Sequence, residues 1–420
     1  MSISIDRHDL RRGLETAKRF CDHRSAVPTL DTVLMAVGDG TVTLSATDMD
    51  TACAVWVPAD TNGTRFSAAI KGARHMPRAL RHTPGDAVLV DAAEDTAMPG
   101  PVVTITGDGA ALSYEAFPGE DHPEHLGIDA MPMAHTAFRA HLDGTAVAAL
   151  FQALDFACTE ETRFYLNGVA LQPDRRGGPW SYRICATDGH RMFMRSPPVP
   201  DATATAEWSD WVILPRRALT KLEPMLREAL KSGEDVTLTL GNTAPRNAAS
   251  PQATLTAPAR RIDPSPIRLA EFATSRWTVR VKLIDGIFPL VDRVVPEVRP
   301  DRQVRFEVPA LRAALRLLTA INPASRTCAA ISLAVDGDRC TLARSVIGAG
   351  QGTVTVPCQT GTPNRKITVG VNVGYLSRAL DRLGASESVV LQMDDADGAP
   401  IRLMSDDAPE SLAVVMPMRV

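Results

Sequence analysis

The chain has 420 residues, of which 45 % are hydrophobic and 22 % are charged, and its formal net charge is −4. This length predicts two to four domains, and an aromatic content of 5 % predicts aliphatic cores. The acidic balance argues against a protein whose whole surface is basic, which is the usual composition of a nucleic-acid-binding domain.

The cysteine and histidine patterns argue against a disulfide-rich protein and against a metal-binding protein. The seven cysteines are scattered and form no CxxC pair, which argues against a disulfide framework or a zinc site and favours a reducing cytoplasm. The nine histidines show no HxH or HxxxH spacing, so we expect no metal and no cofactor. No apolar run reaches the roughly 18 residues of a membrane span, and the start MSISIDRHDLRRG lacks the apolar segment of a signal peptide. A cytoplasmic protein is therefore expected.

The first third of the chain alternates helix-like and strand-like text. Leu10, Leu14 and Ala17 form one apolar stripe, which predicts an amphipathic helix over 7–21. The further elements expected are strands over 32–37, 41–48 and 86–92 and a second helix over 71–82. Pro77 stands within that second helix, so a kink or a shorter helix is expected there.

The middle third of the chain repeats this order. Val147, Leu150 and Leu154 follow helical spacing and predict a helix over 143–158. The further elements expected are strands over 165–173, 182–188 and 235–241 and a helix over 215–231, which contains Pro224. The stretch 242–266 is rich in Pro, Ala and Thr, and we interpret it as an excursion within this part of the chain.

The last third shows the order once more. Leu311, Leu315 and Leu318 predict a helix over 308–322. The further elements expected are strands over 330–335, 339–345 and 388–394 and a helix over 372–383. The three series indicate an internal repeat, since each unit reads helix, two strands, helix, strand. We predict three α+β domains of one design, over 1–125, 136–290 and 291–420, with a linker in 117–132.

The charge is divided between the helices and the rest of the chain. The six expected helices carry 18 Lys and Arg against seven Asp and Glu, a net charge of +11, so the remainder carries −15. A basic helical surface on an acidic body is the pattern of a polyanion-binding protein. Lysine and arginine on solvated helix faces would give the same count without a ligand. The repeat favours a polyanion, because three similar units could place their helices on one surface.

Four motifs stand in a fixed order: FYLNGVAL at 164–171, ATDGHRM at 186–192, LIDGIFP at 283–289 and VVMPMR at 414–419. With RSAVPTL at 24–30 and the threefold repeat, they resemble the beta subunit of bacterial DNA polymerase III, the sliding clamp. The resemblance covers essentially the whole chain. It implies three clamp domains, each with two helices on the inner side and β-sheets outside, and a head-to-tail dimeric ring. Such a ring encircles duplex DNA without reading its sequence and performs no catalysis.

The resemblance also implies partners. A clamp of this family confers processivity on the replicative polymerase, is opened by a clamp loader that hydrolyses ATP, and docks peptides in a cleft between its second and third domains. The expected partners are duplex DNA, an alpha-type subunit of DNA polymerase III, the clamp loader, other polymerases and repair proteins bearing clamp-binding peptides, and a second copy of the chain in a homodimer.

The same resemblance assigns residues to the peptide cleft, where an apolar surface with a few polar anchors is expected. Methionine suits such a site because its unbranched side chain adapts to several partners. The residues carried over are Leu166, Thr187, Gly189, His190, Arg191, Met192, Pro289, Arg293, Val294, Val414, Met416, Pro417, Met418, Arg419 and Val420. Alternatively, the terminal methionines could simply finish a strand in a core.

Further residues are assigned by resemblance to DNA and to the second copy. The DNA-facing residues are Arg24, Phe164, Tyr165, Arg216 and Arg217. The dimer-interface residues are Leu112 and Tyr114 on a first-domain strand and Leu317 and Leu318 at the end of a third-domain helix.

The chain departs from the family pattern in three places. Leu290 and Val291 follow LIDGIFP where the family usually has an acidic and then an aromatic residue. Val420 ends the chain where leucine is common, and the 242–266 excursion is longer than usual. A specialised second clamp with altered partner preference therefore stays open, as does a protein-binding scaffold that does not bind DNA.

Two features could suggest an enzyme. Asp188 and His190 could form a general acid–base pair, but no serine or cysteine nucleophile accompanies them. GAGQG at 348–352 resembles a phosphate loop, yet the text that follows is strand-like where such a loop needs a helix. Neither pattern supports catalysis, and no catalytic residue is expected.

Overall fold

A computed structural model describes most of the chain, and its described residues fall into two compact units. The described residues are 2–94, 100–122, 133–174, 181–197, 203–204, 208, 211–243, 267–321, 329–384, 387–394 and 398–419. The first unit comprises Met1–Gly144, Val199–Ser209 and Arg217–Leu283, and the second comprises Thr145–Pro198, Asp210–Arg216 and Ile284–Val420. Among the described residues, no helix is long and apolar enough to cross a membrane.

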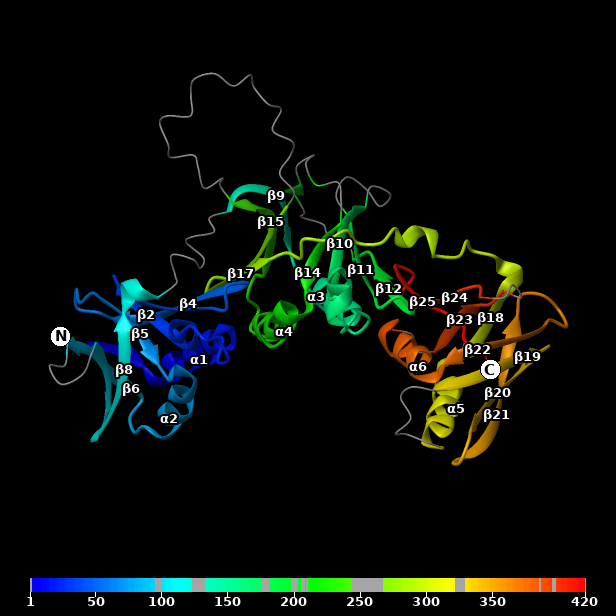
Figure 1. Ribbon diagram of the computed structural model, residues 1–420, viewed down its shortest axis with the longest axis horizontal. Helices are drawn as coiled ribbons and strands as arrows, with labels where there is room; N and C mark the ends of the chain where they lie inside the picture. The colour runs from blue at the N-terminus through cyan, green and yellow to red at the C-terminus, as the bar shows by residue number, and fades with distance from the viewer. Residues whose placement is uncertain are drawn as a thin grey trace, which may run out of the picture. The chain divides into compact units, whose positions relative to one another are not determined.

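The first unit is built on one 13-stranded sheet, in the order β1-β6-β7-β8-β5-β2-β3-β4-β17-β16-β15-β9-β13 (Figure 1). Its strands are β1 (Ile3–Asp6), β2 (Thr32–Gly38), β3 (Thr41–Thr47), β4 (Thr51–Asp60), β5 (Phe66–Lys71), β6 (Ala87–Glu94), β7 (Pro101–Gly107), β8 (Ala110–Pro118), β9 (Met133–His141), β13 (Thr203–Ala204), β15 (Thr237–Thr243), β16 (Leu269–Ala273) and β17 (Trp277–Lys282).

The second unit is built on one 12-stranded sheet, in the order β14-β10-β11-β12-β25-β24-β23-β18-β21-β20-β19-β22. Its strands are β10 (Gly168–Asp174), β11 (Ser181–Thr187), β12 (Arg191–Arg195), β14 (Val212–Pro215), β18 (Gln303–Glu307), β19 (Ala330–Asp336), β20 (Arg339–Val346), β21 (Gly350–Thr360), β22 (Lys366–Asn372), β23 (Ser388–Gln392), β24 (Ile401–Met404) and β25 (Ser411–Val415).

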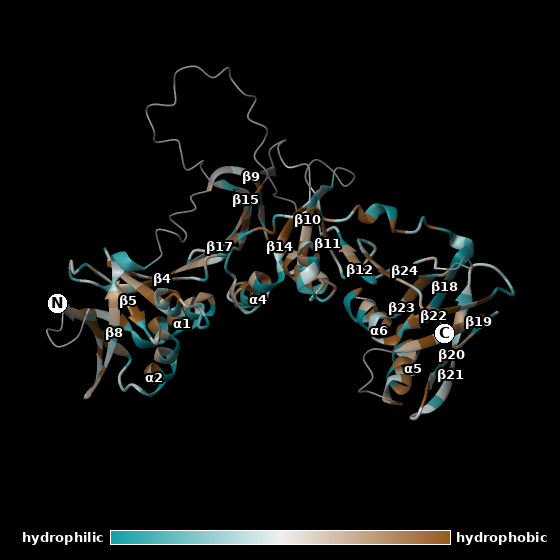
Figure 2. Ribbon diagram, viewed as in Figure 1, coloured by the Kyte–Doolittle hydropathy of each residue, from teal (hydrophilic) through white to brown (hydrophobic). Residues whose placement is uncertain are grey.

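Six α-helices pack against these sheets with their apolar stripes buried. They are α1 (Arg7–Ala17), α2 (Met76–His82), α3 (Gly144–Leu154), α4 (Arg216–Lys231), α5 (Val308–Ala320) and α6 (Val373–Arg382). In the first unit α1 contacts α2, β3 and β4, and in the second α5 contacts α6, β20 and β21 (Figure 1). The predicted stripe of Leu10, Leu14 and Ala17 is fully buried, and the helices carry hydrophobic and hydrophilic residues on one ribbon (Figure 2).

Several predicted boundaries shift in the structure. Strand β5 continues through Lys71, so the second helix is shorter than predicted, and Pro77 lies in its first turn, where a missing N–H is harmless. Residues Glu161–Leu166 form a 3-10 helix, and the strand predicted over 165–173 begins at Gly168. Strand β8 reaches Pro118, within the predicted linker of 117–132, and residues 123–132 lie outside the described residues, as do 244–266 of the excursion.

The predicted threefold repeat is confirmed by strand order. We call β1–β8, β9–β17 and β18–β25 the first, middle and third modules. The first module orders its strands β8-β7-β6-β1-β4-β3-β2-β5, and the third orders them β25-β24-β23-β18-β21-β20-β19-β22. Every strand of one has its counterpart at the same place in the other. In the middle module, β9 pairs with β15 as β1 pairs with β6, and β10 pairs with β14 as β2 pairs with β5.

Neighbouring modules are joined edge to edge. Strand β4 of the first module pairs with β17 of the middle module, and β12 of the middle module pairs with β25 of the third. Each junction thus joins the fourth strand of one module to the last strand of the next. The last strand of the first module, β8, and the fourth strand of the third module, β21, take part in neither junction. Among the described strands, β8 pairs over 110–115 with β7 alone, and β21 pairs over 350–357 with β20 alone.

Candidate functional site

A buried apolar cluster in the second unit brings together side chains from the middle and third modules. Its members are Cys158, Leu166, Ala170, Cys185, Met192, Met194, Ile213, Phe288, Val291 and Val414. We call this set the junction cluster. The structure therefore places three predicted cleft residues, Leu166, Met192 and Val414, in one packed group, although they are far apart in the sequence. Their side chains are buried, so they can form only the floor of a binding surface.

The end of the chain is held against the same junction. The backbone N–H of Met416 donates to the carbonyl of His190 at 2.8 Å, and that of Met418 donates to the carbonyl of Gly370 at 2.8 Å. Met416, Pro417 and Met418 are half-buried. The terminal methionines are thus neither loose nor fully inside a core, which leaves part of each available to a ligand. Arg419 is exposed, and Val420 lies outside the described residues.

A tight turn links β11 to β12 and explains the motif ATDGHRM. The Asp188 carboxylate oxygen Oδ1 accepts hydrogen bonds from the N–H groups of His190, at 2.9 Å, and Arg191, at 3.0 Å. The Thr187 hydroxyl accepts from the N–H of Gly189 at 3.1 Å and donates to the carbonyl of Arg191 at 2.8 Å. Gly189 has φ +88°, a backbone conformation that glycine adopts without strain. Thr187 and Gly189 therefore shape the turn that presents His190.

The Arg191 side chain is fixed rather than free. It donates to Asp188 Oδ2 at 2.9 Å and to the carbonyl of Asp155 at 2.9 Å, and it lies 4.9 Å from the centre of the Tyr375 ring. The exposed His190 ring stacks on the same Tyr375 ring, with 6.3 Å between the two ring centres. Burial raises the pKa of Tyr375, which stays a neutral phenol. Sequence reasoning missed Tyr375, although its place in the second helix of the third module could have suggested a surface aromatic.

The catalytic alternative finds no support in this geometry. Both oxygens of Asp188 are occupied by the turn and by Arg191, so the carboxylate serves to shape the backbone. His190 does not contact that carboxylate through its ring; its ring packs on Tyr375. Among the described residues, no group of three His, Cys, Asp or Glu side chains is placed to hold a metal ion. The sequence GAGQG runs into strand β21 at Gly350, as predicted.

The remaining cleft residues lie on the segment that follows β17. Phe288 and Val291 enter the junction cluster, whereas Pro289, Arg293 and Val294 stay exposed beside it. The predicted residues thus divide into a buried floor and an exposed rim. The structure brings both together in one region of the second unit.

The same turn recurs at the other junction, in the first unit. Asp48 Oδ1 accepts from the N–H groups of Asp50, at 3.1 Å, and Thr51, at 2.7 Å. The Thr47 hydroxyl accepts from the N–H of Met49 at 3.0 Å and donates to the carbonyl of Thr51 at 2.9 Å. Here Asp48 Oδ2 pairs with Lys221 of α4 at 2.6 Å, and both side chains are largely buried. The sequence ATD therefore forms the same hydrogen-bonded turn at both module junctions.

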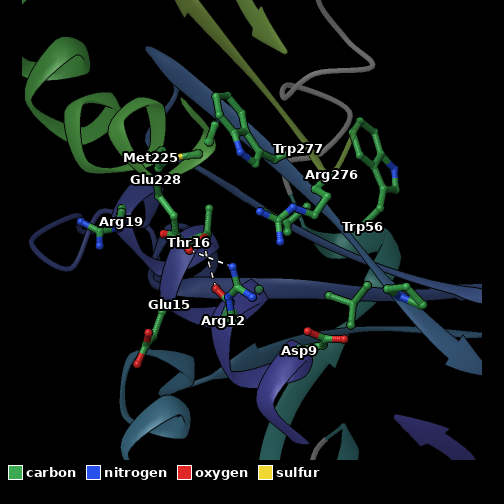
Figure 3. A pocket seen from close by; sticks show the side chains of 15 residues that line it. Asp9, Arg12, Glu15, Thr16, Arg19, Trp56, Met225, Glu228, Arg276 and Trp277 are labelled. Atoms are coloured by element: carbon green, nitrogen blue, oxygen red, sulfur yellow. Dashed lines mark hydrogen bonds and ion pairs between the residues drawn. The ribbon is translucent and has the colours of Figure 1, made fainter. Parts of the chain in front are cut away.

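A pocket of about 240 Å³ lies between α1 and α4 in the first unit (Figure 3). Arg12 and Glu228 point toward each other across it and form an ion pair of 2.9 Å, and Trp277 and Arg276 line its other side. Cations and carboxylates line this pocket in similar number. Its position between the helices of two modules makes it a structural seam with mixed charge.

The chain matches the sequence patterns of two domains of one protein family. They are the DNA polymerase III beta subunit, N-terminal domain, over residues 1–126, and the DNA polymerase III beta subunit, central domain, over residues 141–290.

The chain belongs to the DNA polymerase III beta subunit family.

Similar proteins span the whole chain. The beta sliding clamp of Caulobacter vibrioides is 26 % identical, with 100 % of both chains covered, and that of Pseudomonas aeruginosa is 25 % identical over 100 % of both. Among solved structures, the pol III beta of Caulobacter crescentus superposes with a TM-score of 0.81 at 23 % identity, covering 100 % of both chains. The α+β clamp fold expected from the four motifs is therefore confirmed.

Many helical cations of this beta-subunit chain form ion pairs, chiefly with the helical carboxylates already subtracted in the net charge of +11. The pairs within or at the ends of the helices include Arg11–Glu15, Arg12–Glu228, Arg227–Glu223, Arg312–Asp381 and Arg382–Asp155. Five exposed cations on the helical segments have no side-chain hydrogen bond or ion pair among the described residues, namely Arg19, Arg78, Arg217, Lys231 and Arg316. Only cations that reach a phosphate release counterions from DNA. These five cations are therefore a better guide to possible phosphate contacts than the net helical charge of +11.

The two arginines at the start of α4 have different surroundings. Arg216 is half-buried and donates to the carbonyls of Leu154, at 3.1 Å, and Ala157, at 3.4 Å, so part of its guanidinium bonds within the fold. Arg217 is exposed, as is Arg24. Phe164 is also exposed, whereas Tyr165 is half-buried and packs against the junction cluster. Of the residues predicted to face DNA, Arg24, Phe164 and Arg217 are thus exposed, whereas Arg216 and Tyr165 are half-buried.

The two α5 leucines predicted for the dimer interface differ in exposure. Leu317 is 62 % exposed, whereas Leu318 is 1 % exposed and lies on the buried face of α5. Leu318 is not available to a second copy. Successive residues of a helix point about 100° apart, so Leu318 belongs to the buried apolar stripe although its neighbour Leu317 is exposed. Leu112 and Tyr114 are half-buried neighbours on one face of β8, along the stretch of that strand with an open edge.

Proposed function

We propose that this chain is a DNA sliding clamp, in which two copies close head to tail into a ring around duplex DNA and hold the replicative polymerase on its template. The observation that carries the ring is the pair of open edges. At both junctions within the chain, the fourth strand of one module pairs with the last strand of the next. Strands β21 and β8 are the fourth strand of the third module and the last strand of the first, and they have no such partner among the described strands.

Pairing between copies would complete the series. Strand β21 of one copy would add to β8 of another by the antiparallel pairing that already joins β4 to β17 and β12 to β25. An open edge presents unpaired N–H and C=O groups and is a ready template for another strand. Leu317 of α5, with Leu112 and Tyr114 of β8, would supply the apolar contact at this seam. Leu318 would support it only from inside the fold.

The exposed cations of the helices would contact the phosphates of the duplex. No element of the described chain carries a motif for reading bases, and scattered arginines position a duplex without reading its sequence. The junction cluster, its exposed rim and the half-buried tail would bind peptides of the alpha-type polymerase subunit, the clamp loader, other polymerases and repair proteins. The clamp would perform no chemistry of its own and need no cofactor.

A topological experiment tests the ring. The chain is loaded with ATP and the clamp loader of its source organism onto a nicked circular plasmid, and the complex is isolated by gel filtration. We expect the protein to stay on the circles and to be lost when a restriction enzyme linearises the plasmid, because a ring slides off free ends. Equal retention on circles and linear DNA would argue for ordinary binding and against encirclement.

Charge reversal at Arg217 should weaken DNA association. For Arg217→Glu we expect a several-fold lower affinity for a duplex oligonucleotide, and a plot of log K against log salt that is less steep by about one. Fluorescence anisotropy over a salt series measures both. Arg65→Glu is the control, since Arg65 is also exposed but belongs to no helix and pairs with Asp39. Equal losses in the two variants would contradict the assignment.

A charge at the seam should separate the copies. Leu317→Asp places a carboxylate on the exposed apolar contact, and we expect the dimer dissociation constant to rise by at least about 30-fold, or about 2 kcal/mol. Sedimentation velocity over a concentration series measures it. Leu89→Asp changes a similarly exposed leucine elsewhere and should leave the dimer intact. An unchanged dimer in the Leu317 variant would rule out this seam.

A further inference from the structure

Exposed apolar side chains gather in one short segment of the second unit. Of the ten large hydrophobic side chains that the described residues expose, four lie within 287–298: Ile287, Leu290, Val294 and Val298. We call these four the apolar ridge. Single exposed hydrophobic residues are normal on any protein, but a group of them with a polar rim marks an interaction surface. Phe164, a fifth exposed residue, lies beside the start of the segment, 3.3 Å from the Cβ position of Gly286.

The segment that carries the ridge is held firmly. Arg183 binds Asp292 with both nitrogens, at 2.6 and 3.0 Å, and its guanidinium lies over the Trp211 ring. Arg402 donates to the carbonyl of Pro296 at 2.7 Å. The backbone is therefore fixed while Ile287 remains 91 % exposed and Leu290 62 % exposed. A surface that is ordered before binding loses little entropy when a ligand covers it.

The ridge is continuous with the floor of the proposed peptide site. Phe288 and Val291 enter the junction cluster, and their chain neighbours Ile287 and Leu290 point outward. The N–H of Val294 donates to the carbonyl of Val291 at 2.9 Å, which forms a helical turn with Leu290 and Val294 on its exposed side. A peptide covering the floor would thus reach the ridge within about one or two residues, at roughly 3.3 Å per residue.

The charge beside the ridge indicates the polar part of the ligand. Asp292 is neutralised by the bidentate contact with Arg183. Arg293 is exposed on the same turn and has no side-chain hydrogen bond or ion pair among the described residues. The turn therefore presents one unpaired positive charge among apolar side chains. An acidic residue next to apolar residues complements it.

We propose that the apolar ridge, which meets the exposed rim at Val294, extends the partner-peptide site onto Ile287 and Leu290 and selects partner segments that run past the junction cluster. Their apolar side chains continue past the junction cluster onto Ile287 and Leu290, and they carry an Asp or Glu opposite Arg293. This inference rests on the proposed function of the junction region as a peptide site. A partner with only a short motif would leave the ridge in water and bind more weakly.

Peptide selection tests the ridge. A random 12-residue display library is selected on the full-length chain, and the peptide recovered most often is synthesised with a fluorescein label. Its affinity is then measured by anisotropy for the wild type, for Ile287→Ser/Leu290→Ser, and for a truncation that ends at Val415. We expect the ridge variant to bind about tenfold more weakly, and we expect the truncation to lose binding almost completely. Leu89→Ser, an equally polar change at another exposed leucine, should bind as the wild type does.

The outcomes separate the ridge from the site itself. If the ridge variant binds as tightly as the wild type while the truncation does not bind, the ridge proposal is overturned and the peptide site stands. If no peptide is recovered, or if the truncation binds normally, the peptide site and the ridge proposal both fall. If Ile287→Ser/Leu290→Ser alters self-association on a sizing column but not peptide affinity, the ridge is a contact between copies and not a peptide surface.

Discussion

Replacing Lys221 by methionine is expected to destabilise the folded chain by about 3–5 kcal/mol at pH 7. The Lys221 ammonium is 2.6 Å from Asp48 Oδ2, and the two side chains are only 16 % and 3 % exposed. The variant leaves a buried carboxylate without its cation, which is the costly way to break such a pair. Urea unfolding followed by circular dichroism measures the loss.

The pH dependence of that loss follows from Asp48. Burial opposes ionisation of this carboxyl, but the hydrogen bond and charge of Lys221 outweigh it, so the pKa of Asp48 lies below its usual value. A lowered folded-state pKa contributes stability above the unfolded pKa of about 3.9, and this stability is lost as pH falls through the folded value. The difference between wild type and Lys221→Met should therefore shrink as pH falls, because a proton can neutralise the uncompensated Asp48 of the variant. It should be smallest below the lowered pKa of Asp48 in the wild type, where neither protein holds a charged pair.

A second substitution distinguishes the charge from the packing of Lys221. In Asp48→Asn/Lys221→Met no buried charge remains, and part of the stability lost in the single variant should return. Arg227→Met is the matched surface control, because Arg227 pairs with Glu223 on the exposed side of the same helix and should cost under about 1 kcal/mol. A Lys221 variant as stable as this control would show that the pair does not hold the first junction together.

Removing Met416–Val420 is expected to abolish binding of the display-selected peptide almost completely, since a few central contacts carry most of the energy at such sites. The half-buried Met416 and Met418 follow Val414 of the junction cluster in the chain and are held by backbone bonds to His190 and Gly370. Anisotropy with the labelled peptide measures the loss.

The truncation should leave the fold intact. Strand β25 ends at Val415 and keeps its pairing with β12 and β24, so the urea midpoint and the sedimentation coefficient of the dimer should stay close to those of the full chain. Met416→Ser/Met418→Ser keeps the backbone bonds and replaces the two apolar side chains by short polar ones. Undiminished peptide affinity in both variants would show that the tail is a structural strand extension and no part of a binding site.

Local patterns allowed most of the fold to be predicted. The apolar stripe of α1 and the letters ATD at two strand ends are set by neighbours within a few residues, and the structure confirms both. The joining of β4 to β17 could not be predicted, because these strands are more than 200 residues apart and many pairings satisfy the same alternation.

Charge was the least predictable part of the candidate site. A count of helical residues cannot show that Arg216 binds the carbonyls of Leu154 and Ala157 while its neighbour Arg217 is exposed. It also cannot show that Arg382 is neutralised by Asp155, more than 200 residues away. Likewise, the spacing of α5 placed Leu318 in the core stripe, and only the assignment by resemblance put it at an interface.

The ladders that cross the two module junctions determine how such a protein can deform. Bending at β4–β17 or at β12–β25 would break backbone hydrogen bonds along five residue pairs at once, while the chain connection keeps the strands close enough to re-form them. A contact between separate copies made by the same kind of ladder lacks that tether. In the ring proposed above, an applied force would therefore open the intermolecular seam before either junction within a chain.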